Sequence, residues 1–389
     1  MNIADIQSAL RAEKLDGWLF FDHHGRDPLA YRVLQFAPER MTTRRWYYFI
    51  PANGEPRKLV HQIESGMLNA LPGEKTQYSG WAAQVEGIRT ITGGAKKVAM
   101  QYSANCAIPY VAMVDAGTIE LVRSLGLEIV TSANLVQEFE ATWNQAKLDS
   151  HLEAGKRVDK VRRRAFEHIG DCLRGRAAIT EFEVQQFILR AFDDEGLLTD
   201  HGPIVGVNQN ASNPHYEPTR ENSSYISQND LVLIDLWAKL KTAGSVYYDI
   251  TWMGYAGDQP PSEMVRVFDI VSGARNAAVA FIKKSVAAGD KLCGYQVDDV
   301  ARGHIAEHGL AEYFFHRTGH SIGEEVHGTG ANMDNLETHD DRRIIPWTCF
   351  SIEPGIYLPE FGIRSEVNVF IGETEARVTG EIQTELFLI

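Results

Sequence analysis

The most informative stretch for the fold of this chain is LVLIDLWAKLKTAGSVYYDITWMGYAG, residues 231–257. LVLID is an apolar strand that ends in an acid, Asp235, and VYYDITW is a run of strand-forming residues around a second acid, Asp249. The intervening KLKTAGS suits a hairpin-like return, so we expect the two aspartates to lie close together on neighbouring strands. An aspartate in an apolar strand is costly unless it is paired or metal-bound, so the pair predicts either a hydrogen-bonded structural role or a site.

A second apolar hairpin that carries acids is predicted for FSIEPGIYLPEFGIRSEVNVFI, residues 350–371. Glu353 ends the first strand at a Pro-Gly turn. Arg364 and Glu366 are two apart in the next strand, so their side chains should point the same way. Arg364 either binds a ligand or only forms an ion pair with its acidic neighbours.

Three histidines lie between these hairpins in HRTGHSIGEEVHGTG, residues 316–330. His316 and His320 have the spacing at which a helix would present both to one metal. The glycines around them weaken a helix by about 1 kcal/mol each, so we expect a strand or a turn instead. His316 and His320 should then share one strand face, with His327 beyond a bend.

Together, the two hairpins and His320 predict a site with four carboxylates and one imidazole. Four ionised carboxylates would repel one another and raise some of their pKa values, whereas two divalent cations would neutralise them. Oxygen ligands with one imidazole suit Mn²⁺, with Co²⁺ and Zn²⁺ as alternatives. Two such ions hold a bridging water whose lowered pKa makes it a hydroxide nucleophile at neutral pH.

A faint internal repeat surrounds these motifs. TEFEVQQFILRAFDDEGL, residues 180–197, aligns on its glycine with GYQVDDVARGHIAEHGL, residues 294–310. Thr180 and Glu183 predict a capping box at the start of the first helix. A histidine-bearing, glycine-spaced segment follows each helix. Chance similarity of two amphipathic helices is one interpretation, and a duplicated domain with its site between the halves is the other.

The order Asp, Asp, His, Glu, Glu, in the contexts GHSIG, EPGIY and GIRSE, resembles the pita-bread metallopeptidases, which include prolidase, aminopeptidase P and methionine aminopeptidase. The resemblance implies an α/β protein with a small creatinase-type amino-terminal domain, residues 1–147, and a pseudo-twofold α+β pita-bread catalytic domain, residues 148–389. Thirteen residues separate the two aspartates, more than the family usually has, and Gly328 stands where many relatives have an acid. Both departures bear on specificity more than on metal binding.

The resemblance also implies a role for each site residue. Asp235 would bind one metal, Asp249 and Glu366 would bridge both, and His320 and Glu353 would complete the second. Glu353 would also act as general base and acid, and His327 would contact the scissile peptide group. His215 and His316 would line the substrate pocket, and Arg364 would meet the substrate's terminal carboxylate. Each of these last four could instead be a structural residue.

The predicted function is dinuclear metal-dependent hydrolysis of an Xaa-Pro peptide bond, with Xaa-Pro dipeptides preferred. One alternative is an Xaa-Pro aminopeptidase that acts on longer peptides. Another is an amide hydrolase of the creatinase or ectoine-hydrolase kind, although creatinase-like members lose the ligand set that is complete here. A binding protein built on the same fold would also be expected to lose ligands. The resemblance implies a homodimer.

Composition and the amino-terminal part set the remaining bounds. The net charge of −14 argues against nucleic-acid partners and anionic membranes. The first residues do not resemble a signal peptide, no apolar run has the length of a membrane span, and four well-separated cysteines suit a reducing compartment, so we expect a cytoplasmic location. Before residue 146 the chain alternates strand and helix patterns, with two strands predicted around Asn53–Gly54. The charged stretch after it predicts a long helix whose arginines are solvated.

Overall fold

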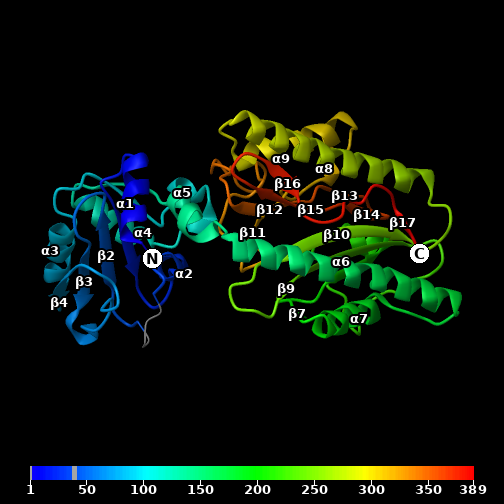
Figure 1. Ribbon diagram of the computed structural model, residues 1–389, viewed down its shortest axis with the longest axis horizontal. Coiled ribbons are helices and arrows are strands. Elements are labelled where there is room, and N and C mark those ends of the chain that lie inside the picture. The colour runs from blue at the N-terminus through cyan, green and yellow to red at the C-terminus, as the bar shows by residue number, and fades with distance from the viewer. Residues whose placement is uncertain (1, 37–41) are drawn as a thin grey trace. The chain divides into compact units, whose positions relative to one another are not determined.

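The computed structural model describes residues 2–36 and 42–389. These residues belong to two compact units, Met1–Glu140 and Ala141–Ile389 (Figure 1). None of the helices in the described part of the chain is both long enough and apolar enough to span a bilayer.

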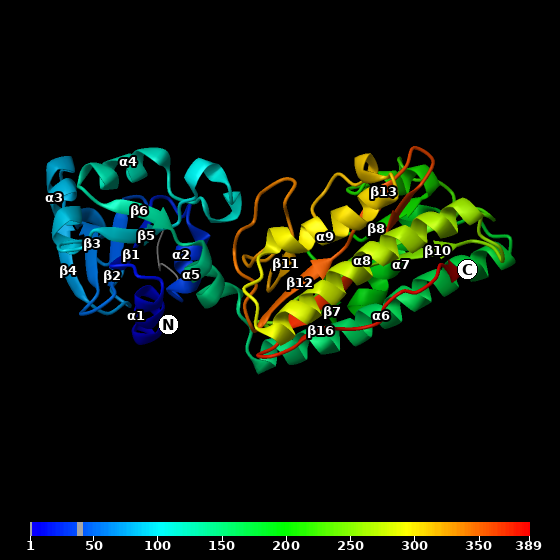
Figure 2. The ribbon, with the colours of Figure 1, turned by 90° about the horizontal axis from the view of Figure 1, so that it is seen from above.

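The first unit is built on a six-stranded mixed sheet. Its order is β4-β3-β2-β1-β5-β6, with bounds β1 Gly17–Asp22, β2 Trp46–Pro51, β3 Arg57–His61, β4 Glu74–Tyr78, β5 Lys97–Met100 and β6 Glu128–Thr131. Helices cover both faces (Figure 2), namely α1 Ile3–Ala12, α2 Pro28–Val33 and α5 Ala133–Val136 on one, and α3 Trp81–Ile91 and α4 Ala116–Ser124 on the other. The hairpin predicted around Asn53–Gly54 is confirmed, since β2 and β3 pair antiparallel.

The second unit holds its strands between two helix pairs (Figure 1). The pairs are α6 Gln145–Arg174 with α7 Glu181–Asp194, and α8 Ser262–Ala288 with α9 Gly294–Glu307. One sheet contains β7 Leu197–Leu198, β8 Ile204–Val207, β9 Leu231–Leu240, β10 Tyr248–Tyr255 and β17 Phe387–Leu388. The others contain β11 Ser321–Ile322, β12 Thr348–Ile352, β15 Val367–Ile371 and β16 Ala376–Val378, and the hairpin β13 Gly355–Tyr357 with β14 Gly362–Arg364.

The two helices of the internal repeat match in detail. α7 and α9 each have 14 residues, and each begins with a capping box, Thr180 with Glu183 and Cys293 with Gln296. Each is followed by a glycine in the left-handed region, with φ of 70° at Gly196 and 73° at Gly309. Equal lengths, caps and stops at aligned positions favour duplication over chance similarity.

The β9–β10 hairpin separates the two cores of this unit. Alternate residues of β9 point to opposite sides, so that Val232 and Ile234 pack with α6 and α7 whereas Leu231 and Leu233 pack with α8 and α9. The next residue on the second face is Asp235. On that face, the apolar core therefore stops where the predicted site begins.

The prediction that the arginines of α6 are solvated is wrong for Arg162. This side chain is buried against the ring of Trp252, 3.4 Å from its centroid, and donates to Asp159 and Glu381. Packing of α6 against its neighbours buries this charge, and hydrogen-bond partners compensate it. The loop of residues 332–342 also has a buried part, since the Asp340 carboxylate accepts from the amide of Asn332.

Candidate metal centre

Both predicted aspartates lie on one face of the β9–β10 hairpin. The antiparallel register places Asp235 opposite Thr251, and Asp249 opposite Trp237. Because side chains alternate along a strand, these four residues point to the same side. Both carboxylates are buried, with residue exposures of 8% and 5% for Asp235 and Asp249. The prediction that they lie close together on neighbouring strands is confirmed.

The second half of the unit delivers Glu366 to this face through β15, which packs beside β10. The amide of Glu366 donates to Thr251 O at 3.3 Å, and the Thr251 hydroxyl donates to Glu366 Oε2 at 2.9 Å. Two residues further on, the Asn368 side chain accepts from the Asp249 amide at 3.2 Å and donates to the Asp249 carbonyl. The two halves are thus joined by hydrogen bonds at the position of the acids.

His320 and Glu353 arrive on two short paired segments. The amide of Ser351 donates to His320 O at 2.9 Å, and the amide of Glu353 donates to Thr318 O at 2.7 Å. A Cβ on Gly319 would lie 1.9 Å from Ser351 O, so only glycine permits this approach. The segment is not helical, as predicted from its glycines, and His320 directly precedes β11.

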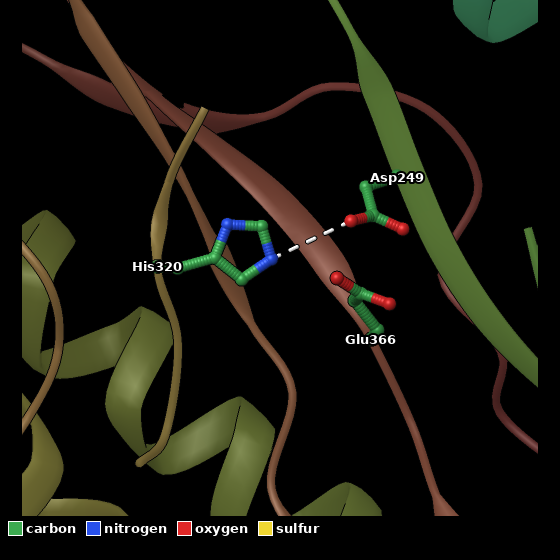
Figure 3. Close-up of side chains that lie close together, drawn as sticks. All are labelled: Asp249, His320 and Glu366. Carbon is green, nitrogen blue, oxygen red and sulfur yellow. Dashed lines mark ion pairs between the residues drawn. The ribbon is translucent and has the colours of Figure 1, made fainter. Parts of the chain in front are cut away.

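The structure brings His320 against the acids of both hairpins. Its Nε2 lies 3.4 Å from Asp249 Oδ2 and 3.4 Å from Glu353 Oε1. Figure 3 shows Asp249, His320 and Glu366 converging, and their ligand atoms all lie within 4.8 Å of one another. His320 Nδ1 lies 3.1 Å from Ser321 O. A carbonyl can only accept, so Nδ1 carries the proton and Nε2 presents its lone pair to the acids.

Arg364 links Asp235 to the cluster of the other acids and His320. It is 3% exposed, and its Nη2 lies 2.5 Å from Asp235 Oδ2. Its Nε donates to the Thr251 hydroxyl at 3.0 Å and lies 4.0 Å from Glu353 Oε2. The prediction that Arg364 and Glu366 point the same way is confirmed, since both contact Thr251. The alternative of an ion pair is also realised, but with Asp235 and not Glu366.

Crowding of the acids sets their proton affinities. Burial raises the pKa of Asp235 to about 7, against the opposing effect of Arg364. Burial, followed by the charge of a neighbouring acid, raises the pKa values of Asp249 and Glu366 well above their usual range. Glu353 differs. Burial alone would raise its pKa, but His320, His316 and Arg364 together hold it below its usual value. Glu353 therefore stays ionised, whereas the others need a compensating positive charge to ionise.

The unsatisfied oxygens of the cluster fit divalent cations. Within residues 2–36 and 42–389, no group donates a hydrogen bond to Asp235 Oδ1, Asp249 Oδ1 or Glu366 Oε1, although all three atoms are buried. Buried carboxylate oxygens without donors are costly, and a cation is the partner that relieves them. Carboxylates with one imidazole form a donor set for Mn²⁺, Co²⁺ or Zn²⁺.

The other predicted histidines lie at different depths. His316 Nε2 accepts from the Tyr357 hydroxyl at 2.7 Å, and burial lowers the pKa of His316 to about 4. The ring of His327 stands on edge against His320, with centroids 4.4 Å apart, and the neighbouring His320 is the main cause that lowers its pKa to about 3. His327 and His215 are both exposed, and the His215 amide donates to Asn213 Oδ1 at 3.1 Å. In the described part of the chain, neither side chain is hydrogen-bonded to the cluster, and His327 contacts it through the ring of His320.

Sequence reasoning missed four residues that hold the cluster in place. Tyr357 accepts from Arg364 Nη1 at 3.1 Å, and the Ser351 hydroxyl donates to Glu353 Oε1 at 2.9 Å. Thr251 and Asn368 are the other two. Thr251, Ser351 and Asn368 each lie two residues from a predicted ligand. Tyr357 is the last residue of the EPGIY motif. Strand alternation was therefore the signal for Thr251, Ser351 and Asn368.

Comparison with known proteins agrees with this geometry. Residues 149–373 match the model of metallopeptidase family M24. The chain belongs to this family. The predictions of a pita-bread metallopeptidase and of a mixed α/β fold are thereby confirmed.

Two of the relatives that this chain matches in sequence are peptidases of different descriptions. The chain is 27% identical to the probable dipeptidase PepE of Mycobacterium tuberculosis over 349 residues, which cover 87% of this chain and 84% of the relative. It is 31% identical to the Xaa-Pro dipeptidase of Lactobacillus delbrueckii subsp. lactis over 244 residues, 59% of this chain and 58% of the relative. The crystal structure of dipeptidase PepE from Mycobacterium ulcerans matches with a TM-score of 0.72 at 24% identity, covering 100% of this chain and 96% of that one, which shows the fold.

Proposed function

We propose that this M24 peptidase hydrolyses the Xaa-Pro bond and prefers Xaa-Pro dipeptides, with two divalent cations held by its buried acids. One observation carries the proposal. Two hairpins and a histidine segment, from both halves of the unit, converge on one buried group of oxygens and one imidazole nitrogen. The Xaa-Pro dipeptidase of Lactobacillus delbrueckii subsp. lactis supports the substrate class.

The proposed ligands follow the order of the family motif. Asp235 would hold one cation, His320 and Glu353 would complete the other, and Asp249 and Glu366 would contribute to both. Two bound divalent cations would lower the pKa of a shared water and supply the nucleophile at neutral pH. Mn²⁺ is our first choice for the native ion, with Co²⁺ and Zn²⁺ as alternatives.

Glu353 is proposed as general base and acid. Its side chain is 16% exposed, against 7% for Asp249 and 11% for Asp235, so it is the most accessible of these three carboxylates. Its lowered pKa leaves it ready to take the proton of the attacking water and to pass it to the leaving nitrogen. His327, on edge against His320, is proposed to contact the scissile peptide group.

The other assigned residues would bind the substrate. Arg364 is proposed to receive the terminal carboxylate of a dipeptide through its guanidinium, which already contacts Asp235. His316, fixed by the Tyr357 hydroxyl, and His215 are proposed to line the pocket. The proline nitrogen has no proton to offer, and none of these groups requires one.

Activity on peptides of two lengths tests the proposal. Chelated protein is supplied with Mn²⁺, Co²⁺ or Zn²⁺ and assayed on Xaa-Pro dipeptides and on tripeptides that begin with Xaa-Pro. Cleavage of dipeptides alone is the expected result. Preference for tripeptides would favour the Xaa-Pro aminopeptidase alternative, and failure with every metal and both lengths would favour an amide hydrolase of the creatinase or ectoine-hydrolase kind.

The remaining parts of the proposal concern the whole protein. We propose that residues 1–147 form a creatinase-type domain and residues 148–389 the catalytic domain, and that the protein is a cytoplasmic homodimer. Size-exclusion chromatography with light scattering measures the last property directly.

A further inference from the structure

An exposed carboxylate, Asp200, lies beside the metal-site hairpin and has no role in the function proposed above. It belongs to the loop between β7 and β8. Trp237 Nε1 donates to Asp200 Oδ1 at 2.8 Å, and the His201 amide donates to the same oxygen at 3.0 Å. The second oxygen lies 3.3 Å from His201 Nδ1. Trp237, on a rigid strand, thus holds this loop carboxylate in a defined place.

The hairpin register places Asp200 next to the site. Its anchor Trp237 stands directly opposite Asp249 and shares the face of both aspartates. Asp200, held by Trp237, therefore lies at the rim of the site.

Arg364 stands at the other end of the same row. It contacts Asp235 and Thr251, which form the cross-strand pair two residues before the pair of Trp237 and Asp249. Two residues along a strand span about 7 Å. The hairpin face thus runs from a guanidinium, past the acids of the metal site, to a carboxylate.

We propose that Asp200, held by Trp237, receives the α-ammonium group of a dipeptide whose carboxylate is bound by Arg364. The inference rests on the proposed function, because it orients the substrate across the same acids. An extended dipeptide spans about 7 Å from nitrogen to carboxylate, the same scale as the two-residue step between the strand positions of Asp235 and Trp237, which contact Arg364 and Asp200. A carboxylate beside an aromatic ring suits an ammonium group, which both can attract.

The carboxylate of Asp200 is available to such a group. Its side chain is 38% exposed, and burial, which would raise its pKa, is outweighed by the hydrogen bonds from Trp237 and from its own loop, so it is ionised at neutral pH. Lys239, the next residue outward on this face of β9, donates instead to Glu324 O and lies 4.9 Å from the centroid of the Tyr247 ring. The ionised carboxylate of Asp200 therefore favours a cationic group on the ligand.

The first test compares Asp200→Asn on two substrates that differ only in the ammonium group. Asparagine keeps an oxygen for Trp237 Nε1 and removes the charge. For alanyl-proline, kcat/KM should fall roughly 5- to 20-fold, mainly through KM, whereas for propionyl-proline it should change by less than about twofold. Asp193→Asn is the matched control, because Asp193 is exposed and pairs with Lys241. An equal loss on both substrates, at unchanged metal content, would overturn the proposal.

The second test measures binding to chelated protein, so it does not depend on catalysis. Isothermal titration compares N-(2-aminopropyl)proline, in which the scissile carbonyl is reduced, with N-propylproline, which lacks the primary ammonium. The wild-type protein should favour the former about 10-fold, Asp200→Asn should lose that preference, and Trp237→Phe should lose part of it. Loss of the preference in Asp200→Asn supports the ammonium site, even if no peptide is cleaved. Absence of peptide cleavage would refute only the proposed function. A preference retained in Asp200→Asn overturns the ammonium site even if Xaa-Pro dipeptides are cleaved.

Discussion

Glu353 differs from the other acids of the cluster in both exposure and proton affinity. It is the acid whose pKa is lowered, because His320, His316 and Arg364 outweigh the effect of burial. Its oxygens are also held, since Oε1 accepts from the Ser351 hydroxyl and lies 3.4 Å from His320 Nε2. A carboxylate that is ionised, oriented and reachable is suited to proton transfer.

We predict that Glu353→Gln lowers kcat by about 10²- to 10⁴-fold, since the amide cannot take a proton but keeps an oxygen for the Ser351 hydroxyl. Metal content, measured by mass spectrometry of the dialysed protein, should stay close to that of the wild type. Glu360→Gln is the control, because Glu360 is an exposed residue of the β13–β14 turn. Unchanged kcat in a metal-replete Glu353→Gln preparation would contradict the role of Glu353 in proton transfer.

The raised pKa values of Asp235, Asp249 and Glu366 predict how stability depends on pH in chelated protein. An acid whose pKa is raised by folding stabilises the folded state most below its unfolded pKa, and this contribution is lost as the pH rises through the folded value. Between about pH 4 and pH 7, the chelated protein should therefore lose stability through these groups.

Added Mn²⁺ should reverse this loss, because cations bind the ionised acids and displace their protons. The rise in Tm on adding Mn²⁺ should be larger at about pH 8 than at about pH 5, as measured by differential scanning fluorimetry. An equal rise at both pH values would show that these acids do not take up the metal. Asp193→Asn, far from any predicted ligand in sequence, should show the wild-type pattern.

At the scale of elements, the site depends on the close pairing of residues 318–320 with residues 351–353. The pairing carries His320 and Glu353, and Gly319 makes it possible. Glycine is required at this position because of Ser351, a neighbour that lies far away in the sequence. The histidine segment could be predicted to avoid a helix from its glycines, but the reason for this particular glycine is visible only when Ser351 is in place.

We predict that Gly319→Ala destabilises the protein by about 3 kcal/mol, the upper end for overpacking, because the new methyl group would meet a backbone carbonyl. Activity should fall with it, since the shift moves His320 and Glu353 apart. Gly303→Ala is the matched control. Gly303 lies within α9, and its added Cβ would meet nothing within 4 Å. The control should gain up to about 1 kcal/mol in urea denaturation, because alanine favours helix.

Local patterns predicted several elements correctly. The β9–β10 hairpin, the capping box of α7 and the strands around Asn53–Gly54 were each predictable, since turn residues and alternation act within a few positions. Local patterns did not predict the burial of charged side chains. Arg162 belongs to a helix face that looks solvated in sequence. It is buried because α6 packs on β9 and β10, where Arg162 lies over the Trp252 ring, while Asp159 of the same helix and Glu381 accept its hydrogen bonds.

At the scale of the second unit, the acids join two halves that each have their own core. Asp235 and Asp249 come from the hairpin that faces α6 and α7 on one side, and Glu353 and Glu366 come from strands packed under α8. Cations bound between them would restrain both halves together, because the ligands come from segments of both halves.

We predict that chelation raises amide hydrogen exchange in both halves of this unit at once. Peptides that contain residues 231–255 and peptides that contain residues 348–371 should exchange faster in chelated than in metal-loaded protein. Peptides that contain β1, residues 17–22, or β2, residues 46–51, serve as the internal control and should exchange at the same rate in both states. A change confined to one of the two halves would argue against ligands contributed by both.

Periodicity, turn chemistry and residue type are properties of neighbouring positions, so the β9–β10 hairpin with both aspartates, the capping box of α7 and the order of the five candidate ligands could be predicted from the sequence. The contact of Arg364 with Asp235, the hydrogen bonds between Asn368 and Asp249, and the position of Asp200 against Trp237 appear only in the folded structure. Contacts between distant segments depend on which faces pack together, and the burial that raises or lowers each pKa exists only once they have packed.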